Sequence, residues 1–237
     1  MPKINEATVK SLTLEAKNGN AKAQIRLGEM YYFGKDVEQN YKTSVKWHTL
    51  AAKSGQVESQ LALGTMYDLG QGVEQNYKTA VKWFALAAEQ GYSKAQSNLG
   101  EMYYFGQGVE QNYKTAVKWF TLAAEQGFIL AQNFLGVMFR LGHGVEQNYE
   151  TAVKWFTLAA EQGLPVAQKN LGAMFMFGYG VKRNSIYAYM WLQIAISSGS
   201  WSALEYIKTL DKTMTSADIS KAKELTVRFK YDKNNLN

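Results

Sequence analysis

The sequence predicts an all-α fold: a solenoid of five 36-residue repeats, each made of two helices, with a capping helix at either end. Three observations predict it. Glycine recurs at a constant interval, at Gly19, Gly55, Gly91, Gly127, Gly163 and Gly199. Tryptophan recurs at the same interval, at Trp47, Trp83, Trp119, Trp155 and Trp191. Between these markers, each period holds two runs of apolar residues with helical spacing.

The start of the chain resembles the second half of a repeat. Val9 and Ala16 lie one period before Val45 and Ala52, although Ser11 stands where the later copies have tryptophan. A degenerate half-repeat at a terminus can cover the apolar end of a stack of repeats. We therefore expect a capping helix in residues 1–19.

The third copy shows how each repeat is built. Ala95 and Leu99 belong to a first helix that should end at residues 105–108, where glycines can adopt the positive φ that stops a helix. Asn112 is placed to cap a second helix, which Gly127 should end. The five repeats are thus expected at residues 20–55, 56–91, 92–127, 128–163 and 164–199, which together span residues 20–199.

Small residues are expected to let the two helices of a repeat approach each other closely. The first helices carry Gly28, Gly64, Gly100, Gly136 and Gly172, and the second helices carry Ala51, Ala87, Ala123, Ala159 and Ala195. The recurring tryptophans should then fill the gaps between repeats as buried packing residues. In the first repeat Asp36 replaces a loop glycine, and we expect the same left-handed turn there.

The C-terminal part, residues 200–237, begins a further repeat and then departs from it. Lys208 stands where the first helices have glycine. Thr215 and Asp218 form a capping box that predicts a final helix. We expect this helix to close the core and to end near Tyr231, with residues 232–237 frayed.

The recurring pattern AxxxLGxMYxxGxGVxxNxxxAxxWxxxAAxxG resembles the Sel1-like repeat, a relative of the tetratricopeptide repeat. One copy carries it at Ala95, Leu99, Gly100, Met102, Tyr103, Gly106, Gly108, Val109, Asn112, Ala116, Trp119, Ala123, Ala124 and Gly127. The resemblance implies a right-handed α–α superhelix and a role as a scaffold or adaptor in protein complexes. A cysteine-rich branch of the family, clamped by disulfides, does not apply because the chain has no cysteine.

Comparing the five copies separates constant from variable positions. The first helix varies at repeat positions 3, 6, 10 and 13, which lie on one helical face. By resemblance to tetratricopeptide arrays, this face lines a concave groove. We call it the variable stripe, and in chain order it consists of Lys22, Ile25, Glu29, Tyr32, Glu58, Leu61, Thr65, Asp68, Lys94, Ser97, Glu101, Tyr104, Leu130, Asn133, Val137, Arg140, Val166, Lys169, Ala173 and Met176.

The chemistry of the variable stripe changes along the chain. Copies one to three present charged groups and tyrosine. Copies four and five present an apolar floor beside Arg140 and Lys169, made of Leu130, Val137, Val166, Ala173 and Met176. An extended peptide or a partner helix with an apolar end and a charged end would suit this gradient. Free drift of exposed positions after duplication is the alternative explanation.

Composition argues against several classes of function. The chain has 26 Lys and Arg against 20 Asp and Glu, a net charge of +6. Residues 201–237 carry seven basic and five acidic side chains, so the excess is spread along the chain and does not favour a nucleic-acid partner. No apolar run of about 18 residues predicts a membrane span. No signal peptide is recognisable, so we expect a cytoplasmic protein.

No catalytic, cofactor or metal site is recognisable in the sequence. His48 and His143 lack a third ligand, and the glycines of the repeat loop lie between helices rather than after a strand. We therefore predict a non-enzymatic protein without cofactor or metal that binds another protein or a peptide through the variable stripe. The alternative is an accessory or regulatory subunit that contacts an enzyme or nucleic acid through basic residues of the convex face, namely Lys42, Lys46, Lys78, Lys82, Lys114, Lys118 and Lys154. A less favoured third reading is an enzyme with an unrecognised site in the groove.

Overall fold

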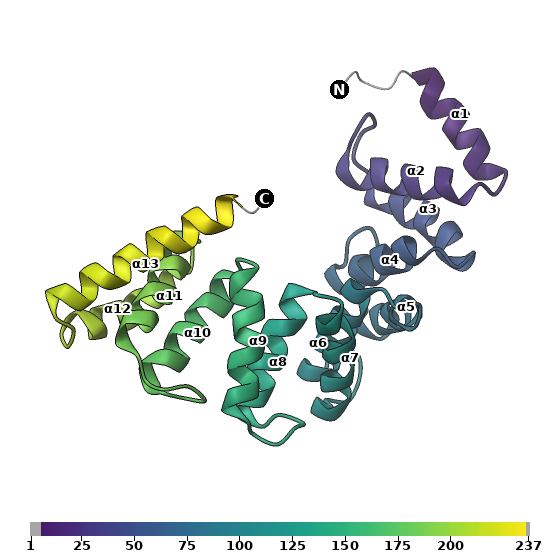
Figure 1. The fold of residues 1–237 in the computed structure, drawn as a ribbon. Helices are drawn as coiled ribbons and strands as arrows, with labels where there is room; N and C mark the ends of the chain where they lie inside the picture. Colours follow the sequence, from purple (N-terminus) through teal and green to yellow (C-terminus); the bar gives the residue numbers. More distant parts are fainter. Residues whose placement is uncertain (1–5, 236–237) are drawn as a thin grey trace. The chain divides into compact units, whose positions relative to one another are not determined.

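The structure, a computed structural model, describes residues 6–235, and this part of the chain contains thirteen α-helices, one short 3-10 helix and no strand (Figure 1). The helices are α1 (Glu6–Lys17), α2 (Ala21–Phe33), α3 (Tyr41–Lys53), α4 (Val57–Leu69), α5 (Tyr77–Glu89), α6 (Ser93–Phe105), α7 (Tyr113–Glu125), α8 (Ile129–Leu141), α9 (Tyr149–Glu161), α10 (Pro165–Phe177), α11 (Ser185–Ser197), η1 (Trp201–Ala203), α12 (Leu204–Asp211) and α13 (Ser216–Asn235). Each repeat supplies two of them, from α2 and α3 to α10 and α11.

The chain divides into two compact units, Met1–Leu122 and Ala123–Asn237, with the boundary inside α7. In the first unit α2 packs on α3, α3 on α4, α4 on α5 and α5 on α6. In the second unit α8 packs on α9, α9 on α10 and α10 on α11. Successive helices are therefore neighbours both within a repeat and between repeats. This packing confirms, within each unit, the predicted all-α solenoid of two-helix repeats.

Asparagine side chains cap the second helices of the repeats as predicted. The side-chain oxygen of Asn76 accepts a hydrogen bond from the backbone N–H of Thr79 at 2.9 Å. Asn40, Asn148 and Asn184 cap α3, α9 and α11 in the same way. Each cap satisfies a backbone donor that has no partner inside its helix, and so fixes where the second helix begins.

Left-handed residues shape the loop between the two helices of a repeat. Gly70 ends α4 with φ +69° and Gly72 follows with φ +75°. Gly72 is required for a second reason, because a Cβ there would overlap the backbone of Tyr41 in the preceding repeat. Asp36 adopts φ +65°, so the predicted turn also forms in the first repeat. For Asp36 the position that corresponds to Tyr41 is residue 5, which lies outside the described residues.

An aromatic ring packs against the recurring glycine of each of the first four repeats. Phe84 is 1% exposed, and a Cβ added to Gly64 would overlap its ring. A Cβ on Gly100 would likewise lie 2.9 Å from the ring of Phe120. The glycines therefore make room for a ring of the facing helix, and the recurring alanines such as Ala87 are buried beside it.

The recurring tryptophans are less buried than the sequence suggested. Trp119 is half-buried and packs on the cluster that contains Phe84 and Leu99. Among the five, only Trp191 is buried, and its ring meets that of Phe229 with centroids 4.9 Å apart. Neighbouring positions on a helix are rotated by about 100°, so in the other four repeats the residue after the tryptophan points inward instead. The prediction of a buried filler is wrong for Trp47, Trp83, Trp119 and Trp155.

A recurring buried glutamine, which sequence reasoning missed, ties each first helix to the second helix before it. The side-chain nitrogen of Gln60 donates to the Ala52 carbonyl at 3.4 Å, and its oxygen accepts from Gln90 at 2.7 Å. Gln162 bonds Gln132 in the same way in the second unit. The sequence does carry a signal for this contact, because glutamine recurs at Gln24, Gln60, Gln96, Gln132 and Gln168.

Ser198→Gln is expected to stabilise the protein. The side-chain oxygen of Gln168 is buried without a hydrogen-bond partner among the described residues, because Ser198 stands where Gln90 stands relative to Gln60. Supplying the missing donor should add about 1 kcal/mol to the free energy of unfolding, measured by thermal denaturation. Ser202→Gln, at an exposed site nearby, is the control, and equal melting temperatures for the two variants would contradict the prediction.

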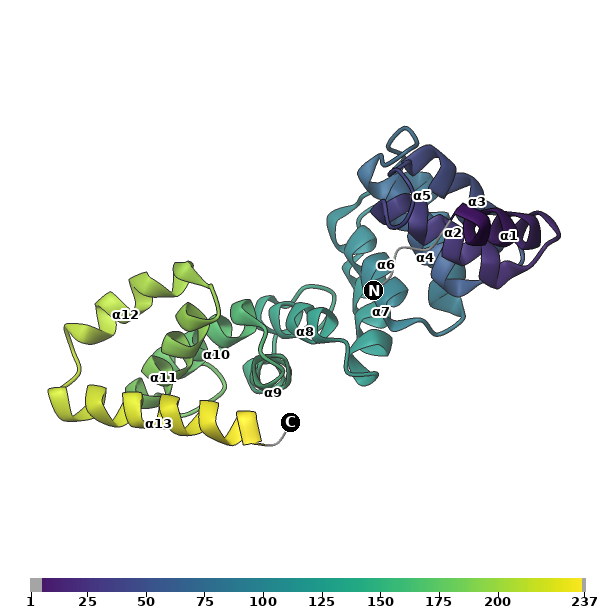
Figure 2. The ribbon, with the colours of Figure 1, turned by 90° about the horizontal axis from the view of Figure 1, so that it is seen from above.

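The C-terminal helices close the second unit. The Thr215 hydroxyl accepts from the Asp218 N–H at 3.1 Å and donates to the Asp218 carboxylate at 2.8 Å, so Thr215 caps α13 and pairs with Asp218 as predicted. α13 packs along α11, as Figures 1 and 2 show. It continues to Asn235 instead of ending near Tyr231, because no glycine or proline follows to stop it. The prediction of fraying is therefore wrong up to Asn235, and residues 236–237 lie outside the described range.

Candidate functional site

Most of the variable stripe is exposed or half-buried, but three of its residues are buried. Leu61, Ser97 and Met176 have little or no solvent exposure. Met176 belongs to a core cluster with Ala188 and Leu192. The Ser97 hydroxyl is buried and has no hydrogen-bond partner among the described residues. The expectation that every stripe residue offers surface to a ligand is thus wrong for Ser97 and Met176, whereas Leu61 lines a hollow.

Six stripe residues from three successive repeats surround one hollow in the first unit. This hollow, which we call the first hollow, has a volume of about 420 Å³. The stripe residues that line it are Glu29, Tyr32, Glu58, Leu61, Thr65 and Lys94. Its wall is completed by Phe33, His48, Ala62 and Tyr92. The structure therefore brings together the variable positions of α2, α4 and α6.

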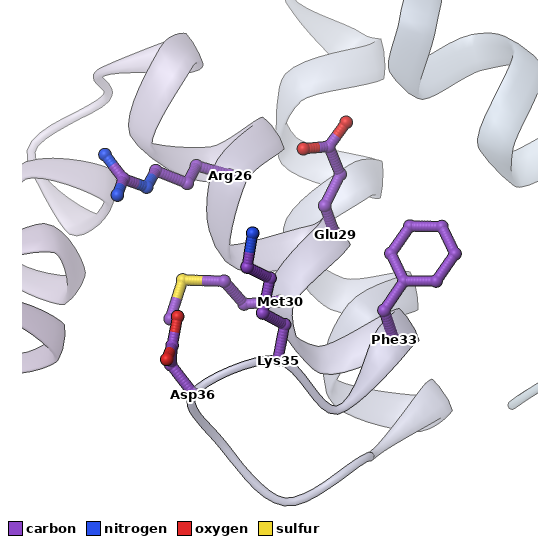
Figure 3. A pocket seen from close by; sticks show the side chains of 6 residues that line it. All are labelled: Arg26, Glu29, Met30, Phe33, Lys35 and Asp36. Atoms are coloured by element: carbon purple, nitrogen blue, oxygen red, sulfur yellow. The ribbon is translucent and has the colours of Figure 1, made fainter. Parts of the chain in front are cut away.

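A second depression of about 330 Å³ lies on α2 and the loop after it. It is lined by Arg26, Glu29, Met30, Phe33, Lys35 and Asp36 (Figure 3). Glu29 and Phe33 also line the first hollow, and Figure 3 shows them on one side of α2 with Met30 and Asp36 on the other. Its two carboxylates and two cations balance, so its charge favours neither a cationic nor an anionic ligand.

Two stripe carboxylates of the first unit, those of Glu101 and Asp68, have raised pKa values. Burial, and secondarily the charge of Asp68, raises the pKa of Glu101 to about 7. Burial also raises the pKa of Asp68 above its ordinary value. Nearby, the Tyr32 hydroxyl donates to the side-chain oxygen of Gln71 at 2.7 Å. The negative charges of Glu101 and Asp68 are unfavourable in this place. Either a bound proton or a cationic group of a ligand would neutralise them.

Glu101 is expected to make the stability of the first unit depend on pH. Because its pKa is higher in the folded chain than the ordinary value of 4.5, its contribution is complete below about pH 4.5 and is lost as the pH rises through about 7. Glu101→Gln should remove this dependence. Carboxyl-carbon NMR should show a Glu101 midpoint near pH 7, lowered in Asp68→Asn. A wild-type midpoint near 4.5 would refute the prediction.

In the second unit, part of the stripe lines a hollow of about 250 Å³, which we call the basic hollow. The stripe residues in it are Arg140, Lys169 and Ala173. The rest of its wall consists of Asn170, Met174, Phe177, Tyr179 and Tyr206. The Asn170 side chain donates to the side-chain oxygen of Asn133, another stripe residue, at 3.1 Å. None of the described residues that line the basic hollow is acidic.

The apolar floor of copies four and five is smaller than the sequence suggested. Leu130 and Val166 are 40% and 37% exposed. Val137, by contrast, packs on the core cluster of the second unit, and Met176 is buried. Ala173 lies at the basic hollow. Two exposed aliphatic side chains therefore remain from the five that the pattern placed on the floor.

His48 has a structural role. It is buried against Gly28, and its Nδ1 lies 3.0 Å from the Ser59 hydroxyl. Burial lowers its pKa to about 4, so the ring is neutral near pH 7. Among the side chains that the structure describes, those of residues 7–229, no group of three or more histidine or acidic residues is gathered so as to hold a metal ion. Within residues 6–235, no helix is both long and apolar enough to cross a membrane.

Comparison with known proteins gives consistent matches. The family model described as Sel1 repeat matches residues 21–56, 57–92, 93–128, 129–164 and 165–200. A protective antigen of uropathogenic Escherichia coli strains, whose structure displays an SLR fold, is 33% identical over 94% of this chain with a TM-score of 0.81. This chain spans 48% of that protein.

Two further solved structures are similar. A Sel1 repeat protein from Oxalobacter formigenes is 28% identical, with 89% of this chain and 85% of that one covered and a TM-score of 0.78. A putative Sel1 repeat protein from Klebsiella pneumoniae is 20% identical, covers 86% of this chain and 99% of its own, and has a TM-score of 0.52, so it shows the fold alone. No curated protein matches the chain.

Proposed function

We propose, because this chain belongs to the Sel1 repeat family, that it is a non-enzymatic scaffold that holds a peptide or partner protein on its variable stripe. Repeat arrays of this kind present one variable face on a constant framework. The stripe residues Glu29, Glu58 and Lys94 are exposed, while the framework beneath them is buried. A ligand bound along the stripe would therefore contact side chains that can vary between repeats without disturbing the packing of the core.

The first hollow is the observation that carries this proposal. Six of its ten lining residues are stripe positions, and they come from three successive repeats. The stacking of the repeats brings these variable side chains together, so one ligand could contact all six of them. The apolar wall of Leu61 and Ala62 beneath the charged rim of Glu29, Glu58 and Lys94 is the usual arrangement of a protein-binding surface.

The chemistry of the first hollow suits an extended segment or a helix with one apolar side chain and flanking charges. Leu61, Phe33 and Tyr92 offer apolar contact, and Glu29 and Glu58 offer two carboxylates against the single cation of Lys94. A basic side chain beside the apolar one would complement this rim. His48 lines the first hollow but is buried and bonded to Ser59, so it does not offer a general base to a nucleophile there.

Charge reversal at the rim tests the proposal. The variant Glu29→Lys/Glu58→Lys should lose its partner by about tenfold or more in pull-downs from a lysate of the source organism, quantified by mass spectrometry. The matched control is Glu74→Lys/Glu110→Lys, which makes the same charge change at exposed loop positions of the same unit. Both variants should keep the wild-type circular dichroism spectrum and melting temperature.

Two results would count against the proposal. If the rim variant and the loop control recover the same proteins as the wild type, the first hollow is not the binding surface. If the wild type instead recovers nucleic acid, with an affinity that falls by about one power of salt per phosphate contact, the exposed convex lysines become the binding surface.

A further inference from the structure

We propose that the basic hollow of the second unit binds a carboxylate of the partner, carried by an acidic side chain next to an aromatic or aliphatic one. This inference rests on the proposed function and adds the chemistry of the ligand. The basic hollow combines two cations, Arg140 and Lys169, with a wall of aromatic side chains.

Two cations without acidic partners create the charge of the basic hollow. Arg140 on α8 and Lys169 on α10 are half-buried and line the same hollow. Neither forms a salt bridge within the described residues, although Glu205 and Lys208 pair on α12. None of the eight stripe residues in copies four and five is acidic. Partly desolvated cations gain more from an anion than exposed ones do, because water screens them less.

The repeat register shows that the fold does not require cations at this place. Arg140 occupies position 13 of copy four, and Lys169 occupies position 6 of copy five. The same two positions of copies two and three hold Asp68 and Ser97, with Glu101 one turn further along α6. An equivalent place is therefore acidic in the first unit and basic in the second, so packing does not fix its charge.

Aromatic side chains form the apolar part of the basic hollow. The rings of Phe177 and Tyr179 are stacked with centroids 5.6 Å apart, and Tyr206 meets Phe177 edge-on at 6.3 Å. Tyr179 also stacks on Tyr149 at 5.0 Å. Because these rings pack against one another, they lose little conformational freedom when a ligand binds beside them. The guanidinium of Arg140 can donate two hydrogen bonds to a carboxylate beside this wall.

A pair of peptides tests the charge preference directly. The probes are acetyl-Phe-Glu-Leu-amide and acetyl-Phe-Gln-Leu-amide, titrated into the isotope-labelled full chain and followed by backbone-amide NMR. The glutamate peptide should shift the amides of Arg140, Lys169 and Tyr206, with half-saturation at about tenfold lower concentration than the glutamine peptide. Added salt should reduce this difference.

Matched variants separate the basic hollow from general charge. Arg140→Gln/Lys169→Gln should abolish the preference for the glutamate peptide. Lys154→Gln/Lys182→Gln, which removes two exposed cations elsewhere in the same unit, should leave it intact. Equal affinities for the two peptides, no shifts at the hollow, or a preference that survives the first variant would overturn the inference. Partner loss in the Glu29→Lys/Glu58→Lys pull-down tests the proposed function separately, since those residues lie in the first hollow.

Discussion

Gly64→Ala is expected to destabilise the wild-type protein but to stabilise a variant in which Phe84 is already alanine. In the wild type, the added Cβ would overlap the ring of Phe84, which is almost fully buried. We expect a loss of about 2 to 3 kcal/mol. Phe84→Ala alone should cost about 3 to 5 kcal/mol through the cavity that it leaves. In that background the clash is gone, and alanine should gain up to about 1 kcal/mol over glycine inside a helix.

Denaturant unfolding of the four proteins in this cycle measures the coupling between the two sites. Gly91→Ala is the control: a Cβ there meets open space, but its φ of +86° strains any side chain. It should cost about 1 kcal/mol in both backgrounds. A harmless Gly64→Ala in the wild type would show that Phe84 is not held as described. Trp119→Ala, at a half-buried ring, should cost less than Phe84→Ala.

His48 and Ser59 are expected to behave as one exchangeable pair. The next copy has Phe84 in place of His48 and Ala95 in place of Ser59. His48→Phe alone leaves the buried Ser59 hydroxyl unpaired, and Ser59→Ala alone leaves the imidazole nitrogen unpaired. Each single variant should lose about 1 to 3 kcal/mol. The double variant His48→Phe/Ser59→Ala should recover most of that loss, because it recreates the arrangement of the next copy.

The same pair predicts a difference in acid sensitivity. The pKa of His48 is lowered from 6.5 to about 4 by burial, so its contribution to stability is present above about pH 6.5 and is lost as the pH falls through about 4. The double variant should lack this loss and gain up to about 3 kcal/mol over the wild type near pH 4. Thermal melts of both proteins at pH 7 and pH 4 measure it. Parallel pH profiles would show that His48 is not buried in its neutral form.

The opposite contribution of Glu101 does not obscure this comparison. Its pKa is raised, so the stability that it contributes is gained as the pH falls and is lost as the pH rises through about 7. Both proteins retain Glu101, and its effect cancels in the difference between them. Without the comparison, the two groups would partly hide each other in the wild-type profile.

Local features of the fold could be predicted from the sequence because short-range chemistry determines them. Asn76 caps a helix by accepting a hydrogen bond from Thr79, three residues further along the chain. Asp36 turns the chain because its own backbone adopts a positive φ. The choice between Trp119 and Phe120 as the buried ring could not be predicted. The two are adjacent and both are apolar, and only the rotation of α7 against Gly100 decides that Phe120 points inward.

The variable stripe could be found by comparing the copies. How deeply each of its residues is buried could not be predicted in this way. Position 6 of the repeat is fully buried at Ser97 yet lines the basic hollow at Lys169. Burial at one position thus depends on the size of the side chain and on its neighbours in the next repeat. The hollows themselves arise between repeats, so no pattern within one copy could predict them.

Site-specific photo-crosslinking tests the central claim of partner binding by the stripe most directly. A photoreactive residue at Thr65, inside the first hollow, is compared with the same residue at Lys82, which the sequence places on the opposite, convex face. If the stripe binds the partner, Thr65 captures a protein that is lost in the Glu29→Lys/Glu58→Lys background, while Lys82 captures none of it. Capture of that protein from Lys82 and not from Thr65 would contradict the account.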